Sequence, residues 1–266
     1  MRTSDVMKPD NGAWHTAITV SDDENTWLRG YDVTELMTHY SFADVVLLLH
    51  QGELPSPAVQ RLINAILVAS ADHGADSPSA LAARVVASGN RRGMEAAIAA
   101  GILAIGDAHG GAGSECMEMI AHGVARAQRE AISIEEAAAR IVAEVKQTGR
   151  RLPGLGLRAR KTEPRTATLF RLATDARVAG AGITFMHALE RQAREQIAYL
   201  PINVDGTIAA ILYDLGFPPA FAKALFIIAH VAGLSAQVME EYTREQPLRI
   251  KMPVEYDGPK PRAALK

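Results

Sequence analysis

The sequence predicts an all-α protein from two observations. Apolar residues recur three or four positions apart over long stretches, whereas strand-like alternation is confined to residues 16–20 and 250–256. Hydrophobic residues make up 48% of the chain but aromatic residues only 5%, so the core must be built from alanine, leucine, isoleucine and valine. The periodicity predicts helices over 57–70, 79–88, 94–105, 115–130, 134–146, 165–179, 183–199, 204–215 and 219–243.

Local signals support individual elements in this order. The first helix reads PAVQRLINAILVAS, which places apolar residues on one face. The 134–146 helix follows Ser133, a residue type that caps helix N-termini, and carries Glu135 and Glu136 in its first turn, where negative charge is favoured. Glycine-containing breaks at 106–113 and 149–156 separate strong helices, and loops of that kind often hold functional residues.

Composition excludes several classes of function. Lys and Arg number 28 against 30 Asp and Glu, so the chain has no overall basic character for binding nucleic acid. Cys116 is the only cysteine, which excludes an intrachain disulfide and fits a reducing compartment. The N-terminus lacks a signal peptide and the apolar stretches are too short to span a membrane, so we expect a cytoplasmic protein. Zinc-ligand spacings and dinucleotide fingerprints are missing, which predicts no bound metal.

Two candidate segments contain a histidine. His73 lies in Asp72-His73-Gly74 after the 57–70 helix, where a histidine is more often a capping or surface residue than part of a site. His109 lies in GDAHGGAGSE, whose glycines permit close approach of a ligand and whose next helix offers N-terminal amides to an acceptor or anion. A flexible turn between helices explains the same glycines equally well.

Two further segments carry charge. Residues 149–165 surround a Pro-Gly-Leu-Gly turn with basic side chains, which favours recognition of phosphate or carboxylate, although a solvated basic loop is the alternative. Asp205 opens the 204–215 helix, where it is either an N-cap or a general base in a pocket that excludes water. The basic residues are Arg150, Arg151, Arg158, Arg160, Lys161 and Arg165.

Taken together and in order, these segments resemble motifs of the citrate synthase superfamily. Asp72-His73-Gly74 followed by AARVVAS resembles its DH…ARVVAS block, and GDAHGGAGSE resembles its HGG block in the form typical of citryl-CoA lyases. LPGLG with KTEPR resembles the PGxGH…KxDPR block, and NVDGTIAAILYDLGFP resembles the block that holds the catalytic aspartate. LRGYDVTEL, LLLHQGELPS, FIIAHVAGLSAQVMEE and PVEYDGP extend the resemblance over residues 14–259. The length of 266 residues favours a resemblance to the small stand-alone citryl-CoA lyases in particular.

The resemblance implies a citrate-synthase fold, with a large helical domain at about 1–150 and 204–266 and a smaller mobile lobe at about 151–203. It also implies a homodimer or higher homo-oligomer that uses a coenzyme A thioester as substrate or product and has no permanently bound cofactor. In the family, the histidine matching His109 stabilises the enol of the thioester, and the aspartate matching Asp205 moves the proton on the adjacent carbon. These roles fit the chemistry, because a developing enolate needs a positioned donor and a base.

The resemblance assigns binding roles as well. His73 matches a residue that lies against the 2-oxo acid, and Arg165 matches an arginine that binds its carboxylate. Arg150 and Arg151 are predicted to hold the phosphates of coenzyme A. The loop that receives its adenine corresponds to Leu152, Pro153, Gly154, Leu155 and Gly156.

Three positions depart from the citrate synthase pattern, and all concern the second substrate. Leu157 stands where the family has a histidine that handles the hydroxyl proton, and His230 stands where it has a carboxylate-binding arginine. Met252 stands where dimers lend an arginine to the neighbouring subunit, although Arg249 lies close. Each lost arginine removes a contact worth roughly 1.5–3 kcal/mol. We therefore expect a second substrate with fewer carboxylates than oxaloacetate, faced by His230, which would supply the proton transfer lost at Leu157; a packed helix histidine is the alternative.

The sequence thus predicts a citryl-CoA lyase-like carbon–carbon lyase. It would act on a 3-hydroxyacyl-CoA thioester and release acetyl-CoA and an oxo acid, which is oxaloacetate if the substrate is citryl-CoA. Two alternatives remain open. One is a condensing enzyme that joins acetyl-CoA to a non-standard oxo acid, and the other is a catalytically degenerate paralogue that binds CoA esters.

Overall fold

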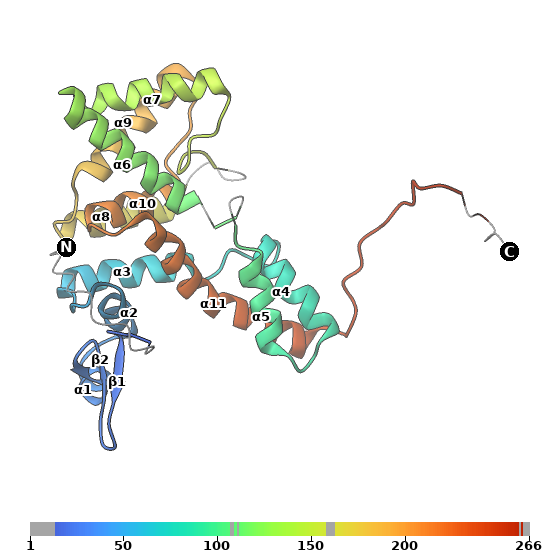
Figure 1. Ribbon diagram of the computed structural model, residues 1–266. Coiled ribbons are helices and arrows are strands. Elements are labelled where there is room, and N and C mark those ends of the chain that lie inside the picture. Colours follow the sequence, from blue (N-terminus) through green and yellow to red (C-terminus); the bar gives the residue numbers. More distant parts are fainter. Residues whose placement is uncertain (1–13, 107–108, 111, 158–162, 261, 263–266) are drawn as a thin grey trace. The chain divides into compact units, whose positions relative to one another are not determined.

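A computed structural model describes residues 14–106, 109–110, 112–157, 163–260 and 262. The chain divides into two units, Met1–Asn64 and Ala65–Lys266, each held together by its own internal contacts. Helices hold most of the residues in the described elements and form all the elements of the second unit (Figure 1), so the predicted all-α class is confirmed.

The first unit begins with a small antiparallel sheet and continues into helices. Its complete elements are β1 (Thr19–Ser21), β2 (Thr26–Leu28), β3 (Tyr31–Asp32), α1 (Val33–His39) and α2 (Phe42–Gln51). Arg29, in the turn between β2 and β3, donates from Nε and Nη2 to the carbonyl oxygen of Leu49 at 3.0 and 2.7 Å. Asp32 caps α1, and Ser41 with Asp44 forms a capping box at the start of α2. Of these elements the sequence prediction found only β1, which it placed at 16–20, and it missed β2, β3, α1 and the ten-residue α2.

The second unit is helical. Its elements, with α3 spanning the division between the units, are α3 (Pro57–Ser70), α4 (Pro78–Gly89), α5 (Met94–Leu103), α6 (Ala112–Glu130), α7 (Ile134–Thr148), α8 (Pro164–Asp175), α9 (Ala181–Gln196), α10 (Val204–Asp214) and α11 (Pro219–Arg244). Each predicted helix is present, with ends displaced by a few residues. The predicted cap at Ser133 is confirmed, since its Oγ accepts a hydrogen bond from the backbone amide of Glu136 at 3.0 Å.

α10 and α11 organise the packing of this unit. α11 packs against α4, α5, α6 and α10, while α10 also packs against α8 and α9. Between α4, α5 and α11 the contact is made by small and branched residues that are completely buried, namely Ala83, Ala87, Ala97, Leu234 and Val238. The alanines let these helices approach closely, which explains how a chain poor in aromatic residues fills its core.

Two expectations need correction or comment. The predicted strand at 250–256 is wrong: Ile250 is half-buried, residues 251–256 are exposed, and within the described part of the chain none of them belongs to a strand. The two compact units of the chain meet between residues 64 and 65, and the division into a large domain at about 1–150 and 204–266 and a smaller lobe at about 151–203 stays a prediction. The smaller lobe at 151–203 contains α8 and α9, and its separate movement stays a prediction.

Candidate active site

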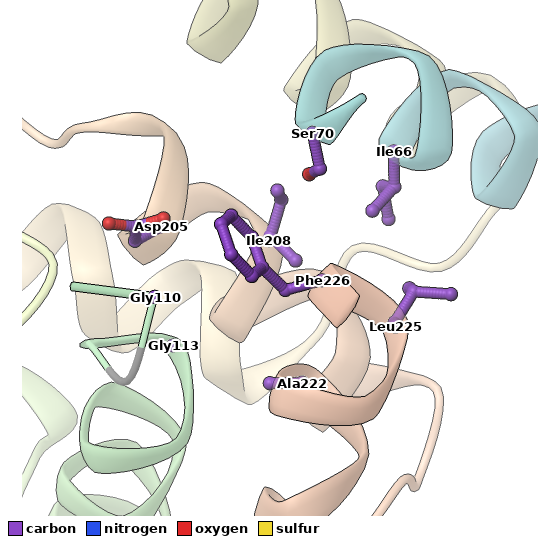
Figure 2. A pocket seen from close by; sticks show the side chains of 9 residues that line it. All are labelled: Ile66, Ser70, Gly110, Gly113, Asp205, Ile208, Ala222, Leu225 and Phe226. Carbon is purple, nitrogen blue, oxygen red and sulfur yellow. The ribbon is translucent and has the colours of Figure 1, made fainter. Parts of the chain in front are cut away.

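A small, partly open cavity in the second unit lies where α3, the start of α6, α10 and α11 meet. Figure 2 shows the Asp205 carboxylate near Gly110, with the side chains of Phe226 and Ile208 beside them. Its lining residues are Ile66, Ser70, Gly110, Gly113, Asp205, Ile208, Ala222, Leu225 and Phe226. Asp205 is the one charged side chain among these nine, so a carboxylate faces a mostly apolar wall.

Asp205 does not cap its helix. The N-cap of α10 is Asn203, whose Oδ1 accepts a hydrogen bond from the backbone amide of Gly206 at 3.0 Å. Asp205 lies in the first turn, where the helix dipole favours a negative charge. The alternative in which Asp205 is only a cap is therefore wrong, and its carboxylate is available to line the cavity.

The LPGLG loop is fastened to the start of α10. The backbone amide of Asn203 donates to the carbonyl oxygen of Gly154 at 3.0 Å, and the amide of Gly156 donates to Pro201 at 2.8 Å. A Cβ at Gly154 would lie 2.7 Å from the Cα of Gly206, and one at Gly206 would lie 2.3 Å from the oxygen of Gly154. Glycine is required at both positions, since the two backbones touch directly beside Asp205.

The residues predicted to bind coenzyme A differ in how far they are buried. Leu152 is buried at 6% exposure, and Pro153, Leu155 and the two glycines form the turn that meets α10. Arg150 and Arg151 are exposed at the surface before the turn. Of the remaining basic residues in this segment, Arg158, Arg160 and Lys161 lie outside the described residues, as do Asp107, Ala108 and Gly111 of the HGG block.

Three histidines from distant parts of the sequence converge beside the cavity. The ring of His230 lies 5.3 Å from that of His73 and 6.3 Å from that of His109, measured between centroids. Phe226, which lines the cavity, stacks on His230 at 5.0 Å and makes edge contacts with His73 at 5.2 Å and His109 at 6.3 Å. The prediction that these histidines share a site agrees with this placement.

Ser79 joins two of the histidines, and the sequence prediction missed it. Its Oγ lies 2.8 Å from Nε2 of His109 and 2.7 Å from Nε2 of His230. Both Ser79 and His230 are completely buried, and Nδ1 of His230 lies 3.3 Å from the carbonyl oxygen of Ser70. The only signal for Ser79 in the sequence was its place at the start of a helix, six residues after His73.

The environment of His73 and His230 favours their neutral forms. Burial, with smaller effects from His230, Arg165 and His109, lowers the pKa of His73 from 6.5 to about 4, whereas Asp72 acts in the opposite direction. Burial also lowers the pKa of His230, against the Ser70 carbonyl and Asp72. Among the described residues, Nδ1 of His73 is buried without a hydrogen-bond partner. It is thus placed to bind a polar group that enters the site.

Arg165 lies in the first turn of α8 and is held by its neighbours. Its Nε and Nη2 contact the two carboxylate oxygens of Glu163, each at 2.7 Å, and its Nη1 donates to the carbonyl oxygen of Ala69 at 2.9 Å. Glu163, with Asp205 contributing, raises the pKa of Arg165. The guanidinium is therefore charged, oriented and only 31% exposed.

The three departures are placed as follows. Leu157 is half-buried, and Met252 is 77% exposed in the C-terminal tail. Arg249 cannot simply replace the expected arginine, because its guanidinium is bound to the buried carboxylate of Glu241 at 2.6 and 3.0 Å. His230 lies next to the site, where it is within hydrogen-bond distance of Ser79 and stacks on Phe226.

Within the described ranges, no group of three histidine, cysteine, aspartate or glutamate side chains is placed to hold a metal ion. α11 is long and apolar enough to cross a membrane by length and composition, unlike the sequence expectation. It is also the helix on which α4, α5, α6 and α10 pack, and core helices of soluble proteins pass the same test.

Comparisons with known proteins decide the family. Residues 54–251 match the profile of the citrate synthase C-terminal domain. This chain belongs to the citrate synthase family. It is an enzyme of the citrate synthase and citryl-CoA lyase type, as its motifs predict.

Individual relatives add detail. The structure of citryl-CoA lyase from Hydrogenobacter thermophilus matches 94% of this chain and 97% of that one, with 38% identity and a TM-score of 0.84. The structure of ATP citrate lyase from Methanothrix soehngenii, in complex with citrate and coenzyme A, covers 95% of this chain and 43% of the lyase chain. The two chains are 20% identical with a TM-score of 0.73, a likeness that shows the fold alone. The peroxisomal citrate synthase of Dictyostelium discoideum is 28% identical over 70% of this chain. The match spans only 37% of that protein.

Proposed function

We propose that the protein is a carbon–carbon lyase of the citryl-CoA type, which cleaves a 3-hydroxyacyl-CoA thioester into acetyl-CoA and an oxo acid. The observation that supports this most is the meeting of three family motifs at one cavity. Asp205 lines it, Gly110 next to His109 lines it, and the LPGLG loop is fastened to the first turn of α10 beside Asp205. Likeness to a citryl-CoA lyase over nearly the whole chain supports the same reaction.

The cleavage assigns a separate task to each residue. The substrate hydroxyl passes its proton to a neutral histidine ring of the site, the adjacent carbon–carbon bond breaks, and its electron pair becomes the enolate of the thioester. Asp205, which enters this step as the carboxylic acid and leaves it as the carboxylate, delivers a proton to the enolate carbon and so yields acetyl-CoA, while His109 donates a hydrogen bond to the enolate oxygen. The apolar wall around Asp205 keeps water from competing for that proton.

The second substrate would carry fewer carboxylates than oxaloacetate. Of the arginines that the family pattern expects, Arg165 stands beside the histidines and is already bound to Glu163 through two contacts. His73 offers a buried ring nitrogen to the same region. One carboxylate at Arg165 and one hydroxyl or carbonyl at His73 would satisfy these groups. The same residues would serve condensation of acetyl-CoA with such an oxo acid.

A substrate panel tests the reaction. Purified protein is offered (3S)-citryl-CoA and 3-hydroxyacyl-CoA thioesters with one or two carboxylates, and the release of acetyl-CoA and oxo acid is followed. Asp205→Asn and His109→Gln should each lower kcat about 10²- to 10⁴-fold. Asp175→Asn is the matched control, since that aspartate forms an exposed pair with Arg171 at 3.3 Å.

The outcomes separate the three readings. Retained turnover in both Asp205→Asn and His109→Gln would refute the assignment of the catalytic groups. Release of free thiol from acetyl-CoA with an oxo acid, without cleavage of any thioester on the panel, would favour the condensing enzyme. Binding of acetyl-CoA without turnover of any compound would favour the non-catalytic paralogue.

We extend the proposal to assembly and location. A homodimer or larger homo-oligomer in the cytoplasm, with no permanently bound cofactor, fits the family motifs and the single buried cysteine. Light scattering coupled to size-exclusion chromatography would measure the assembly, and a monomeric mass at micromolar concentration would refute it.

A further inference from the structure

Two threonine hydroxyls join the first turn of α8 to the first turn of α10. Oγ1 of Thr207 lies 3.1 Å from Oγ1 of Thr166, although the two residues are 41 positions apart in the sequence. Thr207 is completely buried and Thr166 is half-buried. A hydroxyl can both donate and accept, so the contact is a hydrogen bond whichever of the two threonines supplies the proton.

Each threonine stands close in the chain to a charged residue of the proposed site. Thr166 directly follows Arg165 on α8, and Thr207 comes two positions after Asp205 on α10. The charge of Asp205 contributes to the raised pKa of Arg165, so the two groups are near enough to interact electrostatically. Because the hydroxyl pair joins the same two helix starts, it constrains how far the guanidinium lies from the carboxylate.

Other bonds hold each helix start but do not link the two. Asn203, the N-cap of α10, donates from its backbone amide to the carbonyl oxygen of Gly154 at 3.0 Å and from Nδ2 to that of Gly156 at 3.1 Å. These bonds hold α10 on the LPGLG loop and do not reach α8. On α8, the Arg165 guanidinium is bound to Glu163 and to the carbonyl oxygen of Ala69, so it cannot swing freely to compensate for a shift of its helix.

We propose that Thr166 and Thr207 are positioning residues, whose hydrogen bond sets the separation between the Arg165 guanidinium and the Asp205 carboxylate. Neither threonine lines the cavity, so they act through Arg165 and Asp205 and not on the substrate itself. The consequence for catalysis rests on the proposed function, in which Arg165 binds a carboxylate of the oxo-acid half and Asp205 protonates the thioester half. Both halves belong to one molecule until the bond breaks, so the separation selects substrates by the distance between these two ends.

The size of the effect follows from the contact distance. Thr207→Val replaces the hydroxyl by a methyl group of similar size, and the 3.1 Å contact then relaxes toward about 3.5–4.0 Å, the spacing of heavy atoms that share no hydrogen bond. The two helix starts should therefore move apart by about 0.5 Å. Since a misplacement of about 1 Å can slow a reaction about 100-fold, kcat should fall about 10-fold.

Loss of either hydroxyl leaves the other with an acceptor. Oγ1 of Thr207 also lies 2.9 Å from the carbonyl oxygen of Asn203, and Oγ1 of Thr166 lies 3.5 Å from that of Ile202. Neither Thr166→Val nor Thr207→Val therefore leaves a buried hydroxyl without a partner. Both variants should fold, so an effect on turnover can be separated from an effect on folding.

Crystal structures of the full chain test the separation directly and need no turnover. The distance from Cζ of Arg165 to Cγ of Asp205 should increase by about 0.5 Å in Thr207→Val and return to the wild-type value in Thr207→Ser, which keeps the hydroxyl. Thr174→Val is the matched control and should leave the distance unchanged. Thr174 is exposed, and its Oγ1 bonds within α8 to the carbonyl oxygen of Phe170 at 3.0 Å.

Kinetics with the best substrate of the panel test the consequence for catalysis. Thr166→Val and Thr207→Val should each lower kcat about 10-fold, and the double variant should lose no more than either single one, because both remove the same contact. Thr207→Ser should restore kcat. The Kd of coenzyme A, measured by calorimetry, should stay at the wild-type value in all of these variants, since the LPGLG loop keeps its bonds to Asn203.

An unchanged distance from Arg165 to Asp205 in Thr207→Val would overturn the inference, as would kcat losses that add in the double variant or that Thr207→Ser does not reverse. An equal effect of Thr174→Val would overturn it as well. Thr166→Val takes the place of Thr207→Val if the latter does not fold. A distance that changes in Thr207→Val and is restored in Thr207→Ser, in a protein whose wild type cleaves no thioester on the panel, would support the inference and refute the proposed function.

Discussion

Glu241 of α11 is a buried charge whose removal should be costly. Its carboxylate is completely buried and lies 3.0 Å from Nε of Arg84, a side chain that is itself only 8% exposed. Arg249 contacts both oxygens of the same carboxylate. Glu241→Gln keeps the shape of the side chain but removes the buried charge that both guanidinium groups share, which leaves Arg84 with Glu240 at 4.0 Å and Arg249 with Glu245 at 3.0 Å.

The magnitude follows from this geometry. Removing one partner of a buried ion pair costs about 3–5 kcal/mol, because the remaining charge stays out of water. For a chain of this size, about 1 kcal/mol shifts Tm by roughly 2–4 °C, so Glu241→Gln should melt about 6–20 °C lower. Denaturant unfolding and calorimetry at pH 7 measure the two quantities.

The adjacent residue supplies a matched control. Glu240 is 41% exposed, pairs with the exposed Arg244 at 3.0 Å and reaches the buried Arg84 only at 4.0 Å, so Glu240→Gln should cost less than about 1 kcal/mol. Replacing both charges, in Arg84→Met with Glu241→Leu, should recover most of the stability. Equal losses in Glu240→Gln and Glu241→Gln, or a loss below about 1 kcal/mol in the latter, would refute the argument.

Three further outcomes are expected. Because the pKa of His73 is lowered from 6.5 to about 4 in the folded chain, the unfolded chain takes up the proton first as the pH falls. The contribution of neutral His73 to the free energy of unfolding is therefore fully present above pH 6.5 and is lost toward pH 4, by about 2 kcal/mol once solvent screening is allowed for. His73→Gln should flatten this decline, which denaturant unfolding at pH 7 and pH 5 would measure. Gly206→Ala should cost at least about 1–3 kcal/mol, since its Cβ would meet the oxygen of Gly154, whereas Gly106→Ala, with open space around it, should cost under about 1 kcal/mol; equal losses would contradict this. Deleting residues 251–266, of which 251–260 and 262 are exposed, should lower the assembly size in light scattering if the tail binds a second copy, and an unchanged mass would exclude that role.

The helices of the second unit were predictable because their apolar period is long and unambiguous. Segments such as 134–146 and 219–243 carry the signal over several turns, and the structure places α7 and α11 there. The ends were less certain, since α6 begins at Ala112 rather than near 115. The short strands of the first unit and the tail showed the limit of the method: two or three residues of alternation do not reveal whether a partner strand exists.

The site was predictable only through its motifs. Spacing along the chain says nothing of how His73, His109 and His230 meet, because their approach depends on the packing of α11 against α4 and α6. Ser79 carried no chemical signal of its own in the sequence. Its importance comes from two distances, each under 3 Å, that exist only in the folded chain.

The residue at position 230 links the altered pocket to the retained thioester groups. An arginine expected there by the family pattern would be a permanent cation, because a guanidinium stays protonated throughout the working pH range. His230 is instead completely buried, and burial lowers its pKa against the opposing effects of the Ser70 carbonyl and Asp72. The charge at this position therefore depends on the groups around it, whereas the charge of an arginine would not. The substitution thus removes one fixed positive charge from the region of the pocket in which the family pattern binds a carboxylate.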